Sequence, residues 1–495
     1  MKKEINPEMG YNHFEEIPEE KPEEKLEKDL PDERLARLCF GAHPDYIKHS
    51  IKHSQELREK LNPSVQEIEK AILGEKAPVS EFYNKLHQEV FLIPRDRYLN
   101  VVNEDGNSIE LETKKLPFSS YDFYIDFEKE GIFQELYYSK AFFRLAKIKQ
   151  LGYLISPLSK EETEKLFPFY LHSYPWFRHT RQDHSILTAA LMKVVLARNG
   201  FSEEESIAPV LTAAYHDIAM PAGGDFTKRI DPKNLEEEKN FTWVMERNGL
   251  AEKWNKKFGF DISLANEWVQ DKHLIGKLLD VLDKISYTAL DCWHIGQLSR
   301  HEESKIVSLC VQHPLIMDVW QDIKFTPDKT NFGFSNPDRL FQFLLLRAYA
   351  HKELFLNPDS LTVEYFFKQK VQLLYEKGLI TKEQLLANDD EWLLLILNKY
   401  YPEEVKGDVD TGSFYWKRFS TPEEQKEFAN QKGDRVIDLV YESGFNPGLN
   451  LPIISQDRKT ITPIEEVIGK KEIDELKEIS KSTGGYYVYF AQKIV

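Results

Sequence analysis

The sequence contains few cysteines, and their arrangement excludes two classes of protein. Only three of the 495 residues are cysteine, and no two of them have the CxxC spacing. A small disulfide-linked fold or a zinc knuckle needs more cysteines at closer spacing. Because isolated, reduced thiols are typical of the cell interior, we expect a cytoplasmic protein.

The sequence also lacks long apolar runs. No stretch approaches the ~18–20 consecutive apolar residues that a membrane span requires, and the N-terminal stretch has no apolar core of a secretory signal. Neither an internal repeat nor a glycine-rich phosphate loop with the required spacing is present. We therefore expect a soluble chain that has no membrane partner.

Positive charge is scarce as well. The formal net charge is −17, which disfavours sequence-independent attraction to a nucleic-acid backbone. Part of the acidity is local, because residues 1–30 hold ten acidic residues against five lysines. We expect this tail to be solvated and flexible. A small anionic substrate is still compatible with the sequence, because it needs only a local cluster of cations.

Apolar residues at 41% and aromatic residues at 13% are sufficient for a sizeable core. Helical periodicity dominates from about residue 134 to residue 400, whereas "YDFYIDF" near 121 and "GYYVYFAQKIV" at the C-terminus read as strands. The fold class we predict is mainly α, with small β elements in the N- and C-terminal segments. The predicted domains are an acidic flexible tail (1–31), a helical segment with a β-hairpin (32–118), the main helical domain (119–400) and a mixed α/β segment (401–495).

Three apolar helices each carry ionisable residues. His184 lies at the start of the helix predicted over 179–200, and His216-Asp217 end a second helix whose Ser202 and Glu205 form a capping box. In the third helix, over 272–296, the residues at positions i, i+4, i+8 and i+11 share one face. They are Asp283, Tyr287, Asp291 and His294.

Buried ionisable groups must be paired, protonated or bound to a metal. A lone histidine in such a helix is most often a satisfied core residue. Two histidines and two aspartates together form a mixed nitrogen and oxygen set that suits a divalent metal such as Mn, Mg, Fe, Co or Zn. Such a metal lowers the pKa of bound water toward ~7 and supplies hydroxide at neutral pH.

The motifs resemble the HD superfamily of metal-dependent phosphohydrolases, whose pattern is H…HD…D. More narrowly, they resemble the dNTP triphosphohydrolase (dGTPase-like) branch. The matching segments are "FRLAKIKQLG" (143–152), "HTRQDHS" (179–185), "DKISYTALDCWHIG" (283–296), "LLLRAYAHK" (344–352) and "LANDDEWLLLIL" (386–397). The resemblance covers about residues 120–400 and implies an all-helical HD-domain core.

Carried over by position, the resemblance implies a divalent metal held by His184, His216, Asp217 and Asp283. It implies substrate contacts to phosphate, sugar or base from Gln150, Leu151, Arg181, Lys284, Tyr287, Asp291 and Tyr349. Plainer interpretations stay open for several of these. Lys284 can be a solvated flank, Gln150 and Arg181 can cap helices, and Tyr349 can belong to the core.

The chain departs from the branch directly after the HD pair. The branch continues "HDxGHxPFGH", whereas this chain reads "HDIAMPAGGD". Met220 and Asp225 replace the two further histidines, and Glu237 is the candidate for a later acidic position of the branch. Asp225 joins His216 and Asp217 as a catalytic candidate, but it can act as an acid only if its pKa is raised. As a carboxylate it can instead bind a second metal or orient Lys228, and it can also be a helix N-cap or turn residue.

The function favoured by these residues is hydrolysis of a nucleotide, dNTP to deoxynucleoside plus triphosphate. Two alternatives remain: an HD phosphohydrolase of another phosphate ester, such as a nucleoside monophosphate or signalling nucleotide, and a dNTP-binding sensor with little turnover. The resemblance also implies a homo-oligomer. Met220 cannot transfer protons, so one catalytic role of the branch is lost or relocated.

Overall fold

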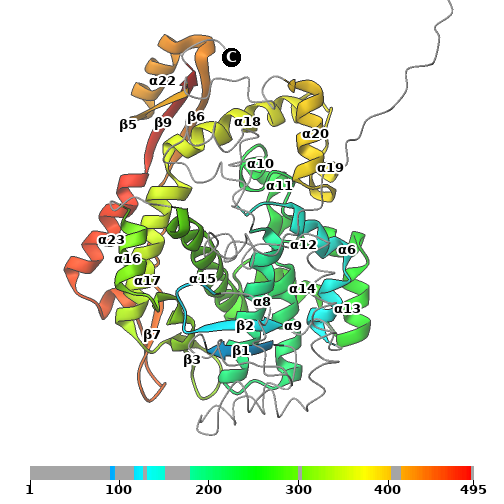
Figure 1. Ribbon diagram of the computed structural model, residues 1–495, viewed down its shortest axis with the longest axis vertical. Helices are drawn as coiled ribbons and strands as arrows, with labels where there is room; N and C mark the ends of the chain where they lie inside the picture. The colour runs from blue at the N-terminus through cyan, green and yellow to red at the C-terminus, as the bar shows by residue number, and fades with distance from the viewer. Residues whose placement is uncertain are drawn as a thin grey trace, which may run out of the picture. The chain divides into compact units, whose positions relative to one another are not determined.

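The computed structural model describes residues 90–94, 116–125, 131–150, 179–298, 304–402 and 414–491. The predicted acidic tail and most of the predicted 32–118 segment lie outside the described residues. Within the described part the protein is mainly helical with small strands (Figure 1), which confirms the predicted fold class.

The described helices are α5 (Ile132–Tyr137), α6 (Lys140–Arg144), α8 (Arg181–Arg198), α9 (Glu203–Tyr215), α10 (Asp225–Lys228), α11 (Pro232–Leu235), α12 (Glu237–Arg247), α13 (Leu250–Phe258), α14 (Ile262–Val269), α15 (His273–Leu298), α16 (Lys305–Gln312), α17 (Pro337–Ala350), α18 (Pro358–Glu376), α19 (Lys382–Ala387), α20 (Asp390–Tyr400), α22 (Pro422–Lys432) and α23 (Lys470–Thr483).

The described strands are β1 (Val90–Pro94), β2 (Tyr121–Ile125), β3 (Ile323–Phe325), β4 (Phe332–Phe334), β5 (Phe414–Phe419), β6 (Val436–Glu442), β7 (Pro452–Ile454), β8 (Ile461–Pro463) and β9 (Gly485–Ala491). They form the sheets β1-β2, β3-β4-β7-β8 and β5-β9-β6. All pairs are antiparallel except β4-β7, which is parallel. The strands predicted near 121 and at the C-terminus are β2 and β9.

Helix α8 is the centre of the main core. Every residue from Arg181 to Leu196 is buried, which is the pattern of a helix surrounded by other elements rather than lying on a surface. Its start is set by Thr180, whose side chain forms a capping box with Asp183. Helices α9 and α15 pack against it, and the predicted capping box of Ser202 and Glu205 begins α9.

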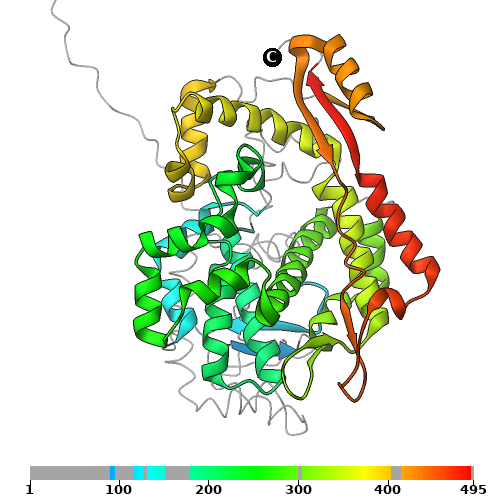
Figure 2. The same cartoon turned by 180° about the vertical axis from the view of Figure 1, so that it is seen from behind.

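The buried apolar residues form two clusters. The larger cluster surrounds α8, α9, α15 and α17, and it includes Phe445, Ile464 and Leu476 from the C-terminal segment. The smaller cluster joins α18, α19 and α20 to β6 and β9, and the β5-β9-β6 sheet lies against α18 (Figures 1 and 2). Residues on both sides of position 400 therefore share each core, and the predicted domain boundaries stay predictions.

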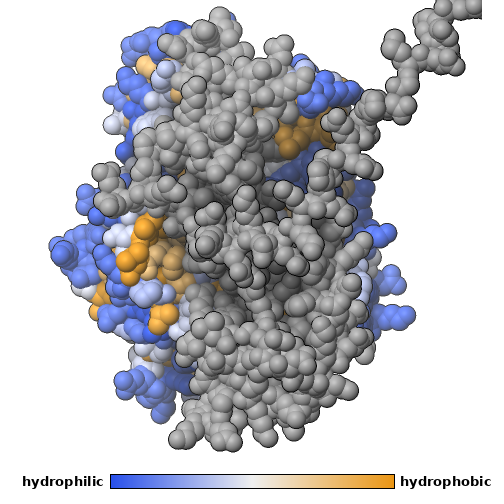
Figure 3. All heavy atoms as spheres, in the orientation of Figure 1, coloured by the Kyte–Doolittle hydropathy of each residue, from blue (hydrophilic) through white to orange (hydrophobic). Residues whose placement is uncertain are grey.

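On the face shown in Figure 3, the described surface is mostly hydrophilic, with small orange patches beside the grey region. Large exposed apolar side chains among the described residues include Val311, Leu395 and Tyr441. None of the described helices is long and apolar enough to cross a membrane.

Candidate metal centre and cavity

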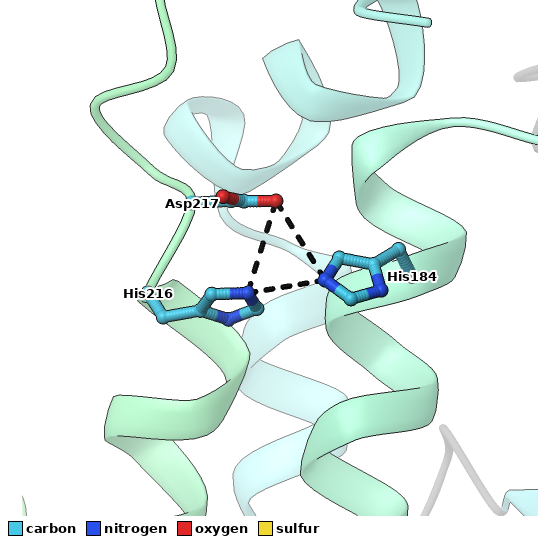
Figure 4. Close-up of side chains that lie close together, drawn as sticks. All are labelled: His184, His216 and Asp217. Atoms are coloured by element: carbon cyan, nitrogen blue, oxygen red, sulfur yellow. Dashed lines mark hydrogen bonds and ion pairs between the residues drawn. The ribbon is translucent and has the colours of Figure 1, made fainter. Parts of the chain in front are cut away.

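Three side chains from two neighbouring helix ends converge on one point. His184 comes from the first turn of α8, and His216 and Asp217 follow the last turn of α9 (Figure 4). The two imidazole Nε2 atoms lie 3.1 Å apart. Asp217 Oδ2 lies 3.8 Å from each of them. All three side chains are buried or nearly so.

Asp283 completes this group from α15. Its Oδ1 lies 2.8 Å from His184 Nε2 and 3.2 Å from His216 Nε2. In an octahedral site with metal–ligand distances of about 2.1 Å, adjacent ligand atoms are about 3 Å apart. The spacings among the two imidazole nitrogens and Asp283 Oδ1 are close to this value, whereas Asp217 Oδ2 lies farther from both imidazoles, at 3.8 Å. The four residues predicted as metal ligands therefore lie together.

The outer nitrogens of both imidazoles have partners that direct Nε2 toward this point. His216 Nδ1 donates to the carbonyl oxygen of Ala213 at 2.7 Å. Ser286 donates its hydroxyl to the carbonyl oxygen of His184, so its Oγ is free to accept from His184 Nδ1 at 3.1 Å. An imidazole held through Nδ1–H presents its Nε2 lone pair for metal coordination.

The pKa values describe a cluster that holds protons when no cation is bound. Burial lowers the pKa of His216, but Asp217 and Asp283 raise it by more, to about 9. Burial raises the pKa of Asp217, but Arg181 and the two histidines lower it by more. The pKa of Asp283 is well below its usual value, because its hydrogen bonds to both histidines outweigh burial. A divalent cation can replace the proton on this cluster.

The metal centre opens into a cavity of about 400 Å³. Its wall includes three of the proposed ligands (His216, Asp217 and Asp283), the catalytic candidate Asp225, and the predicted substrate contacts Gln150, Arg181, Tyr287 and Asp291. This volume is within the ~300–1,000 Å³ range of small-molecule sites. Most of the predicted substrate set thus surrounds one cavity.

The other predicted substrate residues are placed differently. Lys284 does not line the cavity, and its ammonium pairs with Asp280 one turn earlier on α15. Tyr349 also lies off the cavity wall and packs against the main core. Its nearby charges are Glu475, Glu353 and Glu478. Leu151 lies outside the described residues.

Two hydrogen-bonded pairs extend from the metal centre along α15. Arg347 donates from Nε to the hydroxyl oxygen of Tyr287 at 2.9 Å. Asp291 is paired with His179 Nε2 at 2.5 Å, and both side chains are buried. The predicted row of Asp283, Tyr287 and Asp291 is therefore present, with each residue held by a partner from another element.

The loop that follows the HD pair passes from one core cluster to the other. Met220 is fully buried in the main core, and Ala222 belongs to the smaller cluster. Gly223 and Gly224 have φ values of 88° and 64°, a conformation that glycine adopts without steric cost. A Cβ on Gly223 would lie 2.4 Å from Thr227 Oγ1. Met220 is thus a core residue at a position where the resembling branch has a histidine.

This loop is held in place by two residues from other segments. Arg144 donates to the carbonyl oxygens of Ile218 (2.7 Å) and Met220 (2.8 Å). Asp390 accepts from the backbone N–H of Gly223 at 2.8 Å and from that of Lys149 at 2.9 Å. Both lie in motifs of the resemblance, but their partners could not be read from one sequence.

Asp225 is the first residue of α10 and is about half exposed, at 52% of its side chain. Its carboxylate bridges Arg181 Nη2 at 2.7 Å and Lys228 Nζ at 2.9 Å. Although burial acts to raise the pKa of Asp225, Lys228 and Arg181 lower it far below the usual value. The condition for Asp225 to act as an acid, a raised pKa, is therefore not met. Gly224 is the N-cap of this helix, so Asp225 is not a cap.

Several residues of the cavity wall were not among the sequence candidates. Lys228 and Arg229 follow Asp225 and add two cations, whereas Glu364 comes from α18. Burial raises the pKa of Glu364 to about 8; Arg229 opposes this, and Asp225 and Glu442 reinforce it. For Lys228 and Arg229, their closeness in sequence to the HD pair is a signal that could have identified them as cavity residues. Nothing local in the sequence links α18 to this cavity.

His351 also lines the cavity, from a single π-helical turn that continues α17 (His351–Phe355). Its ring is stacked on Phe445 at 4.9 Å, with planes 5° apart. Both ring nitrogens are buried without a hydrogen-bond partner in the described part of the chain. No local signal in the sequence places His351 at this cavity, because a π turn rotates side chains out of α-helical register.

Comparison with known proteins finds similarity to solved structures in fold, and no match in sequence to a family model or a curated protein. Among solved structures, a phosphohydrolase from Bacteroides thetaiotaomicron is similar, with a TM-score of 0.54 and 17% identity over 74% of this chain and 96% of that one. A hypothetical protein from Aquifex aeolicus is similar, with a TM-score of 0.53 and 15% identity over 76% of this chain and 94% of that one.

Proposed function

We propose that this protein is a metal-dependent phosphohydrolase of nucleotides, and that it splits a dNTP into deoxynucleoside and triphosphate. The observation that carries the proposal is the convergence of His184, His216, Asp217 and Asp283 at the wall of a ligand-sized cavity. The phosphohydrolase with a similar fold is consistent with this chemistry.

The four ligands would hold a divalent cation with room for water. When bound, the cation supplies Lewis-acid polarisation of a phosphoryl oxygen and a water of lowered pKa. His216 and Asp217 contribute to catalysis through this coordination. Their spacing is already close to that of a bound site, because Ala213 and Ser286 orient the imidazoles and Arg181 donates to Asp217 at 3.0 Å.

The cations on the described wall of the cavity are Arg181, Lys228 and Arg229, and we assign them to the phosphates. A guanidinium can donate two hydrogen bonds to one phosphate, and an ammonium acts as a point charge. Asp225 holds Arg181 and Lys228 next to each other. Lys284 and Tyr349 are left out of the proposal because neither lines the cavity.

The sugar would lie along the row formed by Tyr287 and Asp291. Gln150 borders the same cavity, and its Oε1 is buried without a partner in the described part of the chain. A buried acceptor without a donor costs about 1–3 kcal/mol, so a ligand hydroxyl that donates to it would be favoured. Gln150, Tyr287 and Asp291 are therefore assigned to the deoxyribose.

Hydrolysis of a different phosphate ester is the second candidate. The observation that favours it is the loop 218–225, where Met220 and Asp225 replace histidines of the resembling branch. The carboxylates on the wall also outnumber the three cations, which is unusual for a site that takes four negative charges without accompanying metal ions.

The test is product analysis with the full chain. The protein is incubated with each dNTP, NTP and nucleoside monophosphate under Mg²⁺, Mn²⁺, Co²⁺ or Fe²⁺, and products are resolved by chromatography. Deoxynucleoside plus triphosphate supports the first proposal, whereas orthophosphate or diphosphate supports the second. Binding without products under all four metals contradicts both and indicates a nucleotide sensor.

A further inference from the structure

Glu237 begins α12 and lies on the cavity wall. Its residue is 9% exposed. One carboxyl oxygen, Oε1, accepts from Lys228 Nζ at 2.7 Å. The other, Oε2, is buried and has no hydrogen-bond partner in the described part of the chain. The carboxyl of this wall residue is thus held at one oxygen, and the other oxygen is left without a partner.

The charges around Glu237 favour a protonated carboxyl. Lys228 is shared between Glu237 and Asp225, so one ammonium serves two carboxyl groups. Glu236, Glu237 and Glu238 bring one oxygen each within 4.8 Å of one another. Burial raises the pKa of Glu237, and the negative charges of Glu238, Asp217 and Asp225 raise it further. Lys228 acts in the opposite direction, and the resulting pKa is about 7. Arg181 also lies close enough to interact electrostatically with this group.

Hydrolysis at an alkyl phosphate ester needs a proton donor, because the leaving oxygen is otherwise a strongly basic alkoxide. The residues in the two positions where the resembling branch carries histidines cannot supply it. Met220 has no proton to give, and Asp225 is ionised between Arg181 and Lys228. Among the described residues, the donor is therefore sought elsewhere on the wall.

Glu237 is connected to the metal centre by an unbroken series of ion pairs. Asp217 pairs with Arg181, Arg181 with Asp225, Asp225 with Lys228, and Lys228 with Glu237. Glu364, another carboxyl of the wall whose pKa is raised by burial, lies instead beside Arg229 and Glu442. The geometry therefore favours Glu237 over Glu364 for chemistry at the phosphate.

We propose that Glu237 is the general acid of this site, and that Lys228 positions it. This inference rests on the proposed function. As water oxygen bonds to phosphorus, the bond from phosphorus to the 5′-oxygen breaks, and the electron pair of that bond remains on the 5′-oxygen. The Oε2 proton of Glu237 passes to this oxygen. The proton that the attacking water loses restores the carboxyl, so no other reactant is needed.

The test compares two leaving groups in the metal-loaded full chain. A dNTP releases an alkoxide that needs a proton, whereas bis(p-nitrophenyl) phosphate releases a phenolate that does not. We expect Glu237→Gln to lower kcat for dNTP at least about 100-fold and kcat for the phenyl ester less than fivefold. The alkaline limb of the wild-type kcat profile, at a pH of about 7, is expected to disappear in this variant.

Glu246→Gln is the matched control, because Glu246 lies on the same helix and is exposed. Thermal unfolding and bound-metal content confirm folding, and Glu237→Asp provides a second variant that keeps a shorter carboxyl. It is expected to lose dNTP turnover more than phenyl-ester turnover. Equal losses for both substrates, or unchanged dNTP turnover in Glu237→Gln, would overturn the inference alone. A wild-type protein that hydrolyses neither substrate overturns the proposed function and the inference with it.

Discussion

At the scale of single residues, the site depends on which carboxyl groups are ionised. Asp225 and Glu237 share one ammonium, that of Lys228. Asp225 has a second cationic partner, Arg181, and its pKa is lowered. Glu237 has no second cationic partner within ion-pair distance in the described chain, and its pKa is raised. The number of cationic partners thus distinguishes Asp225, which is charged and holds Arg181 and Lys228 in place, from Glu237, which is the candidate acid.

We predict that Asp225→Asn lowers kcat for dNTP by less than about tenfold, because an ionised carboxylate donates no proton. The variant is expected to raise KM, since Arg181 and Lys228 lose their common partner. Steady-state kinetics with one dNTP under saturating Mn²⁺ check this. A loss of 100-fold or more in kcat with unchanged KM would indicate that Asp225, and not Glu237, is the general acid.

The carboxyl group of Glu364 is expected to make the thermal stability of the protein depend on pH. Its pKa is about 8, against an ordinary value of 4.5, and burial is the largest cause. A carboxyl group with a raised pKa destabilises the folded state as pH rises from its unfolded to its folded pKa. We expect the Tm of Glu364→Gln to equal that of wild type near pH 4.5 and to exceed it increasingly up to pH 8.

Thermal unfolding at several pH values measures this difference. Glu376→Gln serves as control, because Glu376 is exposed on the same helix, α18. A constant Tm difference across the pH range would show that Glu364 is already ionised in the folded protein.

At the scale of secondary-structure elements, the segment between α9 and α10 joins the two core clusters. Gly223 donates its backbone N–H to Asp390 of α20, and Arg144 of α6 donates to the carbonyl oxygens of Ile218 and Met220 before it. The loop therefore has little freedom despite its two glycines. Its shape places Asp225, Lys228 and Arg229 at the cavity.

We predict that Gly223→Ala destabilises the protein more than Gly200→Ala. Both glycines have positive φ, 88° and 78°, so each substitution carries backbone strain of about 1–3 kcal/mol. Only the alanine at 223 also meets atoms at 2.4 Å and 2.7 Å, whereas nothing lies within 4 Å at 200. Overpacking adds about 1–3 kcal/mol. Denaturant unfolding of both variants measures the difference, and equal losses would contradict the tight loop.

At the scale of the whole molecule, the candidate metal site joins helices from distant parts of the chain. Ligands from α8, the end of α9 and α15 meet inside the main core. The C-terminal segment contributes to the same core and places Phe445 against His351. A cation bound to all four ligands should therefore stabilise the entire fold. Assembly into a homo-oligomer stays a prediction from the resemblance.

We predict that Mn²⁺ raises the Tm of metal-stripped protein and that a chelator reverses this. A ligand at 100 times its Kd adds about 2.7 kcal/mol to the free energy of unfolding. In Asp217→Ala the increase is expected to vanish together with turnover, because a ligand is lost. Calorimetry with and without Mn²⁺ measures it. An undiminished Mn²⁺ effect in Asp217→Ala would place the cation elsewhere.

The sequence by itself determined the mainly α fold and the grouping of the proposed ligands. Helical periodicity is a local property, and a charged residue on an apolar face is constrained to meet a partner. His184, His216, Asp217 and Asp283 could therefore be selected before their distances were known. The positive φ of Gly223 and Gly224 was also predictable from the sequence, because glycine is the residue that adopts this conformation without steric cost.

Only the tertiary structure decided which other residues reach the cavity. Lys284 follows Asp283 directly, yet it does not line the cavity and pairs instead with Asp280, a residue of the wall. Glu237, Glu364 and His351 line the cavity from α12, α18 and a π turn. Which carboxyl keeps its proton depends on burial and on charges far apart in sequence. Those neighbours are set by packing between helices, which periodicity within one helix does not determine.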